Sequence, residues 1–98
     1  MFLVYCIFFD KEKFGFNHNH FYIGQHHTNK IDDGYMGSGK KVKDIYLKYG
    51  SAKAEKRILA ITEDENICNI LEIFFISEYL ETYGNKQVLN IAKGGKGV

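Results

Sequence analysis

The chemically versatile side chains of this sequence begin with a cluster of histidines. All four histidines of the 98-residue chain, His18, His20, His26 and His27, lie within the segment NHNHFYIGQHH at residues 17–27. Imidazole can bind a metal ion or exchange a proton near neutral pH. His18 and His20 are two residues apart with no cysteine pair nearby, so they are weak candidates for zinc ligands. We expect these two to be exposed in a loop, and the pattern alone leaves the roles of His26 and His27 open.

The glutamate Glu72 lies in a strongly apolar helical segment, ILEIFFISEYL. Residues three and four positions apart on a helix are neighbours, and those of Glu72 include Phe75 and Ile76. An ionised carboxylate in such surroundings needs a metal ion, a basic side chain or hydrogen-bond donors to replace its water. Glu72 is therefore a candidate metal ligand, and the alternative is a glutamate at the rim of the apolar face.

Two tyrosines occupy neighbouring predicted strands. Tyr5 lies on the strand face that also contains Leu3 and Ile7, and Tyr22 lies on the next strand. Both hydroxyls could therefore point to one side of the sheet. The alternative is that each ring is a packing residue whose hydroxyl reaches only a partner at the rim of the core.

The composition is that of one folded domain. Apolar residues make up 45% of the chain, and its seven tyrosines and eight phenylalanines are too many aromatic residues for a disordered segment. The longest apolar runs, at residues 1–9 and 73–76, are too short to span a bilayer, and the first lacks the features of a secretion signal. We expect a cytoplasmic protein without a membrane partner, in which Cys6 and Cys68 are reduced and buried.

Hydrophobic patterning divides the chain into strands and helices. Residues 2–9 are apolar on both alternating faces, which is typical of a central strand covered on both sides. Thr62 and Glu65 form a capping box that predicts the start of a long helix. Residues 41–49 predict a short helix with Val42, Ile45, Tyr46 and Tyr49 on one apolar face. The other predicted elements are a hairpin loop at 10–19, a strand at 20–24, a loop at 25–40, a strand at 56–62, the end of the long helix near 83–84 and an edge strand at 88–91. The order β-β-α-β-α-(β) predicts an α+β domain with a small, mainly antiparallel three-stranded sheet flanked by helices.

Basic residues are concentrated between Ser38 and Arg57. This segment holds seven basic and two acidic residues, a net charge of +5, and the final third of the chain is acidic by comparison. The segment could face phosphates, and the alternative is a solvated helix face. Its basic residues are Lys40, Lys41, Lys43, Lys48, Lys53, Lys56 and Arg57.

Together these residues resemble the GIY-YIG nuclease domain over the whole length of the chain. Tyr5 ends the first-strand element LVY, Tyr22 opens an intact YIG, and the first helix ends in a KYG turn. A strand follows, then a helix with the glutamate Glu72, and Asn90 lies in the closing motif LNIAKGG. The segment DGYMGSGKKVKDIYLKYG is similar to the phage-type branch of this family.

The resemblance implies a metal-dependent endonuclease that hydrolyses DNA phosphodiester bonds, with one nuclease domain over residues 1–98 and no appended DNA-recognition region. A single divalent ion, Mg²⁺, would be bound by Glu72 and otherwise by water and phosphate. Tyr5 or Tyr22 would act as general base or hold the attacking water, and Asn90 would orient the site. The implied partner is DNA, with a separate specificity protein or a second copy of the chain as further candidates.

The family has a basic residue at the active site just after YIG, and His26 and His27 match this position. The helix arginine of many members is missing, since the only arginine, Arg57, falls on the third predicted strand. The candidates to replace it are His26, His27, Lys40 and Lys41. The candidates for binding nucleic acid are Lys40, Lys41, Lys43 and Lys48.

The sequence departs from the family pattern in two other ways, and two alternatives to the nuclease hypothesis stay open. LVY lacks the glycine and isoleucine of the family's name, and the loop between the two tyrosines is longer than usual. One alternative is a catalytically weak or inactive DNA-binding module with the same fold, and the other is a structural or interaction protein. The nuclease hypothesis requires Tyr5, Tyr22, an imidazole and Glu72 to converge around a phosphate-sized gap on the same side of the sheet.

Overall fold

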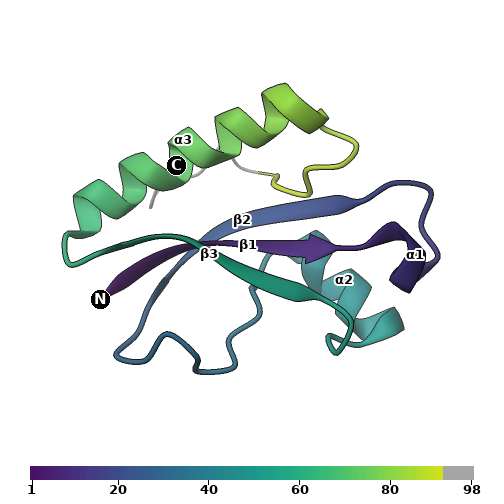
Figure 1. Cartoon of the computed structure of the whole chain (residues 1–98), viewed down its shortest axis with the longest axis horizontal. Coiled ribbons are helices and arrows are strands. Elements are labelled where there is room, and N and C mark those ends of the chain that lie inside the picture. The colour runs from purple at the N-terminus through teal and green to yellow at the C-terminus, as the bar shows by residue number, and fades with distance from the viewer. Residues whose placement is uncertain (92–98) are drawn as a thin grey trace.

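The computed structural model describes residues 1–91, which form three strands and three helices (Figure 1). In chain order these are β1 (Phe2–Phe9), α1 (Lys11–Phe14), β2 (His20–His27), α2 (Lys40–Tyr49), β3 (Glu55–Thr62) and α3 (Glu65–Tyr83). The predicted α+β class, with a three-stranded antiparallel sheet flanked by helices, is confirmed. The last part of the predicted closing motif, AKGG, lies outside the described residues.

β1 is the central strand of the sheet, as its two apolar faces predicted. The strand order is β2-β1-β3, and β1 pairs antiparallel with both neighbours. α3 covers one face of the sheet, and α2 lies on the other side (Figure 1). Every residue from Leu3 to Ile7 is at most 1% exposed, because each face of β1 contributes to a separate hydrophobic core.

The two cores divide the side chains of β1 by alternation along the strand. The buried cluster on the α3 face consists of Val4, Cys6, Phe21, Ile23, Cys68 and Ile76. The buried cluster on the α2 face consists of Tyr5, Ile7, Phe9, Phe14 and Val42. Cys6 and Cys68 are both free and buried, as predicted.

α2 closely follows its predicted bounds. It begins at Lys40, one residue early, and ends before Gly50, whose N–H donates to the Tyr46 carbonyl at 2.8 Å. Val42 is fully buried and packs with Tyr46 on the sheet, so the predicted apolar face is confirmed there. Tyr49, predicted on the same face, is 42% exposed because it lies at the end of the helix.

The predicted Thr62 capping box is wrong, because α3 is capped by Asp64. The Asp64 Oδ1 atom accepts the N–H of Ile67 at 3.0 Å. Thr62 is still part of β3, opposite Phe2, and its hydroxyl accepts the N–H of Asp64 at 3.1 Å. The Thr62 side chain therefore stabilises the turn between strand and helix, and the nearer carboxylate takes the cap position.

Two further boundaries differ from the predictions. The predicted hairpin loop contains the single-turn helix α1, and Asp10 caps it by accepting the N–H of Glu12 at 2.9 Å. β2 continues past Gly24 to His27, because β1 pairs with it along its whole length. His26 and His27 are therefore strand residues whose side chains point to opposite faces.

The predicted edge strand at 88–91 is reduced to one parallel bridge, between Phe21 and Val88. The Phe21 N–H donates to the Gln87 carbonyl at 2.8 Å, and the Leu89 N–H donates to the Phe21 carbonyl at 2.7 Å. At the next outward-facing position of β2, the side chain of Asn90 replaces a backbone partner, so the ladder does not continue.

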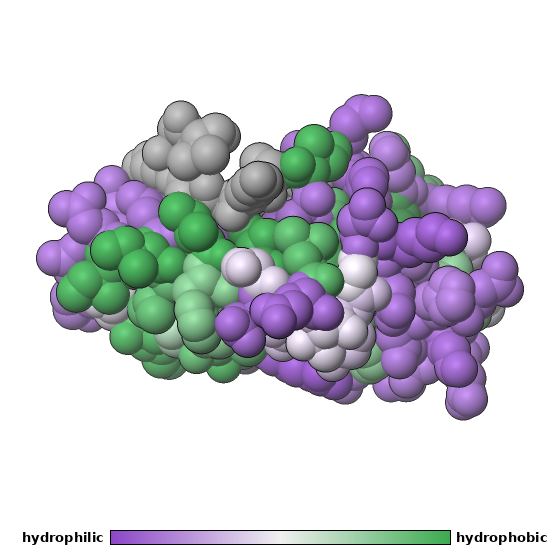
Figure 2. Space-filling view, turned by 90° about the horizontal axis from the view of Figure 1, so that it is seen from above, coloured by the Kyte–Doolittle hydropathy of each residue, from purple (hydrophilic) through white to green (hydrophobic). Residues whose placement is uncertain are grey.

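The outer surface of α3 is partly apolar. Seen from the α3 side, apolar side chains gather over one half of the molecule (Figure 2). Ile67, Ile70, Ile73 and Phe74 of this helix are between 43% and 66% exposed. Within residues 1–91, however, no helix has the length and apolar character needed to cross a membrane.

Candidate active site

Tyr5 and Tyr22 lie on the same face of the sheet, as predicted. Their ring centroids are 6.4 Å apart, and both pack in the core on the α2 face. Tyr5 is paired with Gly24 across the strands, and its ring passes directly over that glycine. A Cβ atom at Gly24 would overlap with the Tyr5 hydroxyl, so this position of the YIG motif must lack a side chain.

The loop between β2 and α2 covers the two phenols. A Cβ atom at Gly39 would lie 2.5 Å from Cε1 of Tyr22, so the backbone at the start of α2 is in direct contact with this ring. The Tyr35 ring meets the Tyr5 ring edge to face, with centroids 5.9 Å apart. The loop therefore contacts both tyrosines of the candidate site: Tyr22 through Gly39 and Tyr5 through Tyr35.

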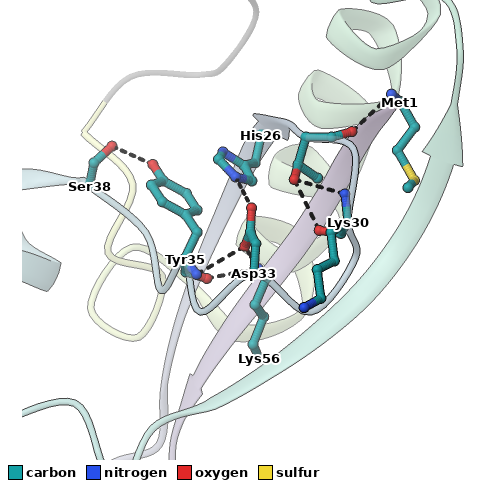
Figure 3. A network of polar contacts seen from close by, with 8 residues as sticks. Met1, His26, Lys30, Asp33, Tyr35, Ser38 and Lys56 are labelled. Carbon is teal, nitrogen blue, oxygen red and sulfur yellow. Dashed lines mark hydrogen bonds and ion pairs between the residues drawn. The ribbon is translucent and has the colours of Figure 1, made fainter.

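Of the two adjacent histidines, only His26 joins the tyrosines. Its Nε2 atom lies 2.7 Å from Oδ2 of Asp33, and its ring stacks on Tyr35 with centroids 3.9 Å apart (Figure 3). His27 stacks on Phe2 at 4.3 Å, on the face that α3 covers. The alternation of side chains along β2 thus reduces the predicted pair to one candidate.

Glu72 lies on α3 and approaches β2 from the opposite face. It is only 9% exposed, and its Oε1 atom accepts a hydrogen bond from Nε2 of Gln25 at 3.0 Å. Gln25 directly follows Gly24 and also donates to Oδ1 of Asn69 at 2.7 Å. The expectation that the acid and both phenols lie on the same side of the sheet is therefore wrong. The helix that carries the acid is needed to cover the Val4 face, and only the edge strand β2 lies between the acid and the phenols.

The electrostatic surroundings keep both phenols protonated. Burial is the largest cause that raises the pKa of Tyr5 and of Tyr22, and the neighbouring Tyr35 and the charge of Glu72 raise both further. A phenol with a raised pKa is a poor base at neutral pH. The two tyrosines therefore suit hydrogen-bond donation to water or phosphate better than proton abstraction.

Asn90 fixes the outer edge of β2. Its Nδ2 donates to the Ile23 carbonyl at 2.7 Å, and its Oδ1 accepts the Ile23 N–H at 3.0 Å. Both backbone groups of the residue before Gly24 are thus satisfied by one side chain. This contact orients the strand that carries Tyr22, and the predicted role of Asn90 in the reaction stays a prediction.

The predicted DNA-binding lysines form an exposed basic surface on α2. Lys40 and Lys41 open the helix next to Gly39, and all four candidates are exposed: Lys40, Lys41, Lys43 and Lys48. The first N–H groups of a helix attract anions. The start of α2, which contacts Tyr22 through Gly39, therefore combines two basic side chains with such donors.

Three residues that lie around Tyr5 and His26 were not predicted from the sequence as site residues: Asp33, Tyr35 and Lys56. Nζ of Lys56 donates to the Tyr35 carbonyl at 2.7 Å and lies 5.5 Å from the centroid of the Tyr5 ring. Strand alternation could have identified Lys56, because it lies opposite Ile7 on the tyrosine face. Arg57 points to the other face of the sheet, where its guanidinium lies 4.4 Å from the centroid of the Phe8 ring. It therefore does not lie beside the tyrosines, where the helix arginine of the family would be expected.

The remaining histidines do not form a metal site. His18 is exposed, as predicted, but His20 is half-buried against Phe16, with ring centroids 5.3 Å apart. The predicted exposure of His20 is therefore wrong, and its burial lowers its pKa. Among residues 1–91, no group of three or more His, Cys, Asp and Glu side chains could hold a metal ion.

The chain is similar to proteins of one phage that are named as endonucleases. It is 39% identical over 79 residues to "Putative endonuclease segB" of Enterobacteria phage T4, covering 81% of this chain and 35% of that protein. It is 37% identical over 76 residues to "Putative endonuclease segC" of the same phage, covering 78% and 37%. "Endonuclease segA" is 29% identical over 79 residues, covering 81% and 35%. The chain thus spans about a third of the length of these relatives. No family model and no solved structure matches it.

Proposed function

We propose that this chain is a DNA endonuclease domain of the GIY-YIG type, which hydrolyses phosphodiester bonds with a single divalent metal ion. The acid does not share a face with the phenols, as the sequence-based hypothesis required, but its charge acts on both of them across the edge strand β2. The observation that carries the proposal is this arrangement around β2. Tyr5, Tyr22 and His26 cluster on one face of this edge strand, and the buried carboxylate of Glu72 contacts it from the other. The similarity to named endonucleases over 78–81% of the chain supports the same reaction.

Glu72 would hold the metal ion. Carboxylate and amide oxygens are the ligand types that Mg²⁺ prefers, and Oε1 of Glu72 and Oδ1 of Asn69 both approach the amide of Gln25. With only one carboxylate at this position, water and phosphate oxygens would complete the coordination, which is an ordinary arrangement for Mg²⁺. When bound, the ion would stabilise negative charge on the leaving 3′ oxygen.

The other side chains would bind and orient the phosphate and the water. Tyr5 and Tyr22, kept protonated, would donate hydrogen bonds to the attacking water or to a phosphate oxygen. Lys40 and Lys41, with the first N–H groups of α2, would bind the DNA backbone. A separate specificity protein or a second copy of the chain would contribute to the choice of site.

A second candidate function is that of a DNA-binding module with little or no cleavage activity. The specific observation in its favour is that Glu72 lies on α3, on the other face of the sheet from both phenols. The two functions differ in one measurable respect: only the nuclease cleaves DNA, and only its cleavage requires the Glu72 carboxylate.

The test is nicking of supercoiled plasmid with Mg²⁺ by the wild type, Glu72→Gln and the control Glu78→Gln, an exposed glutamate of the same helix. We expect Glu72→Gln to lose cleavage by at least ~100-fold, since a metal ligand contributes several kcal/mol to stabilising the transition state. Glu78→Gln should cleave normally, and all three should bind duplex DNA equally. Undiminished nicking by Glu72→Gln would contradict the role of Glu72 as the metal ligand, and binding without nicking by the wild type would contradict the nuclease assignment and favour the second function.

A further inference from the structure

The loop between β2 and α2 places a carboxylate against the imidazole beside the tyrosines. Oδ2 of Asp33 lies 2.7 Å from Nε2 of His26, and Oδ1 accepts the N–H of Tyr35 at 3.0 Å (Figure 3). The Tyr35 N–H is the main cause that holds the pKa of Asp33 well below its ordinary value, and the His26 ring adds to this effect. Asp33 is therefore ionised at neutral pH and accepts the Nε2 proton of His26.

This contact determines which imidazole nitrogen is available for chemistry. A neutral imidazole that donates through Nε2 carries its lone pair on Nδ1, which can accept a proton. The ring is also held in place, because it stacks on Tyr35 with an angle of 7° between the planes. Tyr35 in turn contacts Tyr5, so the imidazole is fixed relative to the phenol pair.

Lys56 anchors this arrangement from β3. Its Nζ donates to the Tyr35 carbonyl at 2.7 Å and lies 3.9 Å from Oδ1 of Asp33. Each carboxylate oxygen of Asp33 thus has its own partners: Oδ2 contacts the imidazole, and Oδ1 contacts the Tyr35 N–H and the ammonium. The titratable and charged groups around His26 are therefore Asp33 and Tyr35 of the loop, Lys56 of β3 and Tyr5 of β1.

We infer that Asp33 and His26 form a dyad in which Nδ1 of His26 accepts the proton of the attacking water and Asp33 orients the imidazole. The inference rests on the proposed hydrolysis of DNA. It makes an imidazole, and not a phenol, the acceptor of the proton from the attacking water. The water oxygen bonds to phosphorus while its proton moves to Nδ1, and the bond from phosphorus to the 3′ oxygen breaks. The released 3′ oxygen takes a proton from solvent, His26 returns its proton to solvent, and Tyr5 and Tyr22 keep theirs.

The first part of the test is independent of cleavage. In the full chain with ¹⁵N-labelled histidines, NMR should show the neutral His26 ring protonated at Nε2 and bare at Nδ1. Asp33→Ala should populate the Nδ1-protonated tautomer as well, because the carboxylate that accepts the Nε2 proton is gone. Asp32→Ala is the matched control, since Asp32 is the exposed neighbour of Asp33, and should leave the tautomer unchanged. The same tautomer in both variants would overturn the dyad.

The second part measures plasmid nicking from pH 5 to 9. His26→Gln should lose at least ~100-fold in rate, as expected for loss of a general base. Asp33→Ala should also slow the reaction, whereas the control Asp32→Ala should not, and the tautomer of His26 in the same variants separates a positioning role from a purely structural one. Cleavage that survives His26→Gln would overturn the dyad and leave the proposed function intact. A wild-type chain that binds DNA but never cleaves it would overturn both.

Discussion

At the scale of single residues, Gly24 lies between the Tyr5 ring and the residue that contacts Glu72. The Tyr5 ring lies over its backbone on one face, and the next residue, Gln25, contacts Glu72 on the other. At Gly24 the edge strand therefore has no side chain on the face of the phenols, next to the residue that contacts the acid on the other face. The same absence of a side chain lets the Tyr5 hydroxyl extend over the edge strand.

Gly24→Ala should destabilise the domain by about 1–3 kcal/mol, because the added methyl group forces the Tyr5 ring to move within a packed core. The measurement is the free energy of unfolding in urea. Combining the variant with Tyr5→Phe removes the nearest atom and should recover at least about 0.5 kcal/mol as coupling between the two sites. Strictly additive effects would show that the Tyr5 hydroxyl is not the group that opposes the methyl group.

At the scale of elements, the turn from β3 into α3 sets the position of Glu72. The Thr62 hydroxyl accepts the N–H of Asp64 in the turn, and the Asp64 carboxylate caps the helix by accepting the N–H of Ile67. The start of α3 fixes which of its residues face the sheet, because helical positions repeat every 3.6 residues. Cys68, Glu72 and Ile76, at four-residue spacing, are its buried residues.

Asp64→Ala should lower the free energy of unfolding by about 1 kcal/mol, the usual loss when an N-cap side chain is removed. Asp64→Asn keeps an oxygen that can accept the Ile67 N–H and should be nearly neutral. Urea denaturation of both variants, with Thr62→Ala for comparison, measures the difference. A larger loss from Thr62→Ala than from Asp64→Ala would assign the cap to the threonine instead.

At the scale of the whole molecule, the two helices on opposite faces of the sheet carry opposite charge. α2 contains four lysines and one aspartate, whereas α3 contains four glutamates and neither lysine nor arginine. Much of the outer surface of α3 is apolar as well (Figure 2). A polyanion should therefore approach the α2 face, on which the tyrosines and His26 also lie.

Replacing Lys41 and Lys43 together by Gln should weaken binding to duplex DNA at every sequence tested. The slope of log K against log salt concentration should fall by about 2, because each lost phosphate contact releases about one counterion fewer. Fluorescence anisotropy at several salt concentrations measures both quantities, with Glu78→Gln on α3 as the control. An unchanged slope would show that DNA does not contact this face of α2.

The sequence by itself determined the elements and the identity of most candidate residues. Alternation and helical periodicity depend only on near neighbours in the chain, so β1 as a doubly covered central strand and the apolar face of α2 were predictable. The tyrosine pair was predictable for the same reason, since both lie on regular strands. Loop 28–39 has no such period, so the positions of Asp33 and Tyr35 could not be derived from the sequence.

Only the tertiary structure decided which side of the sheet His26, His27 and Glu72 face. The extension of β2 to His27 separated the two histidines, and the packing of α3 on the Val4 face put Glu72 across the edge strand from the phenols. These outcomes depend on how long two strands remain paired and on which core a helix completes. Both are fixed by contacts between segments far apart in the chain, which leave no periodic signal within any one of them.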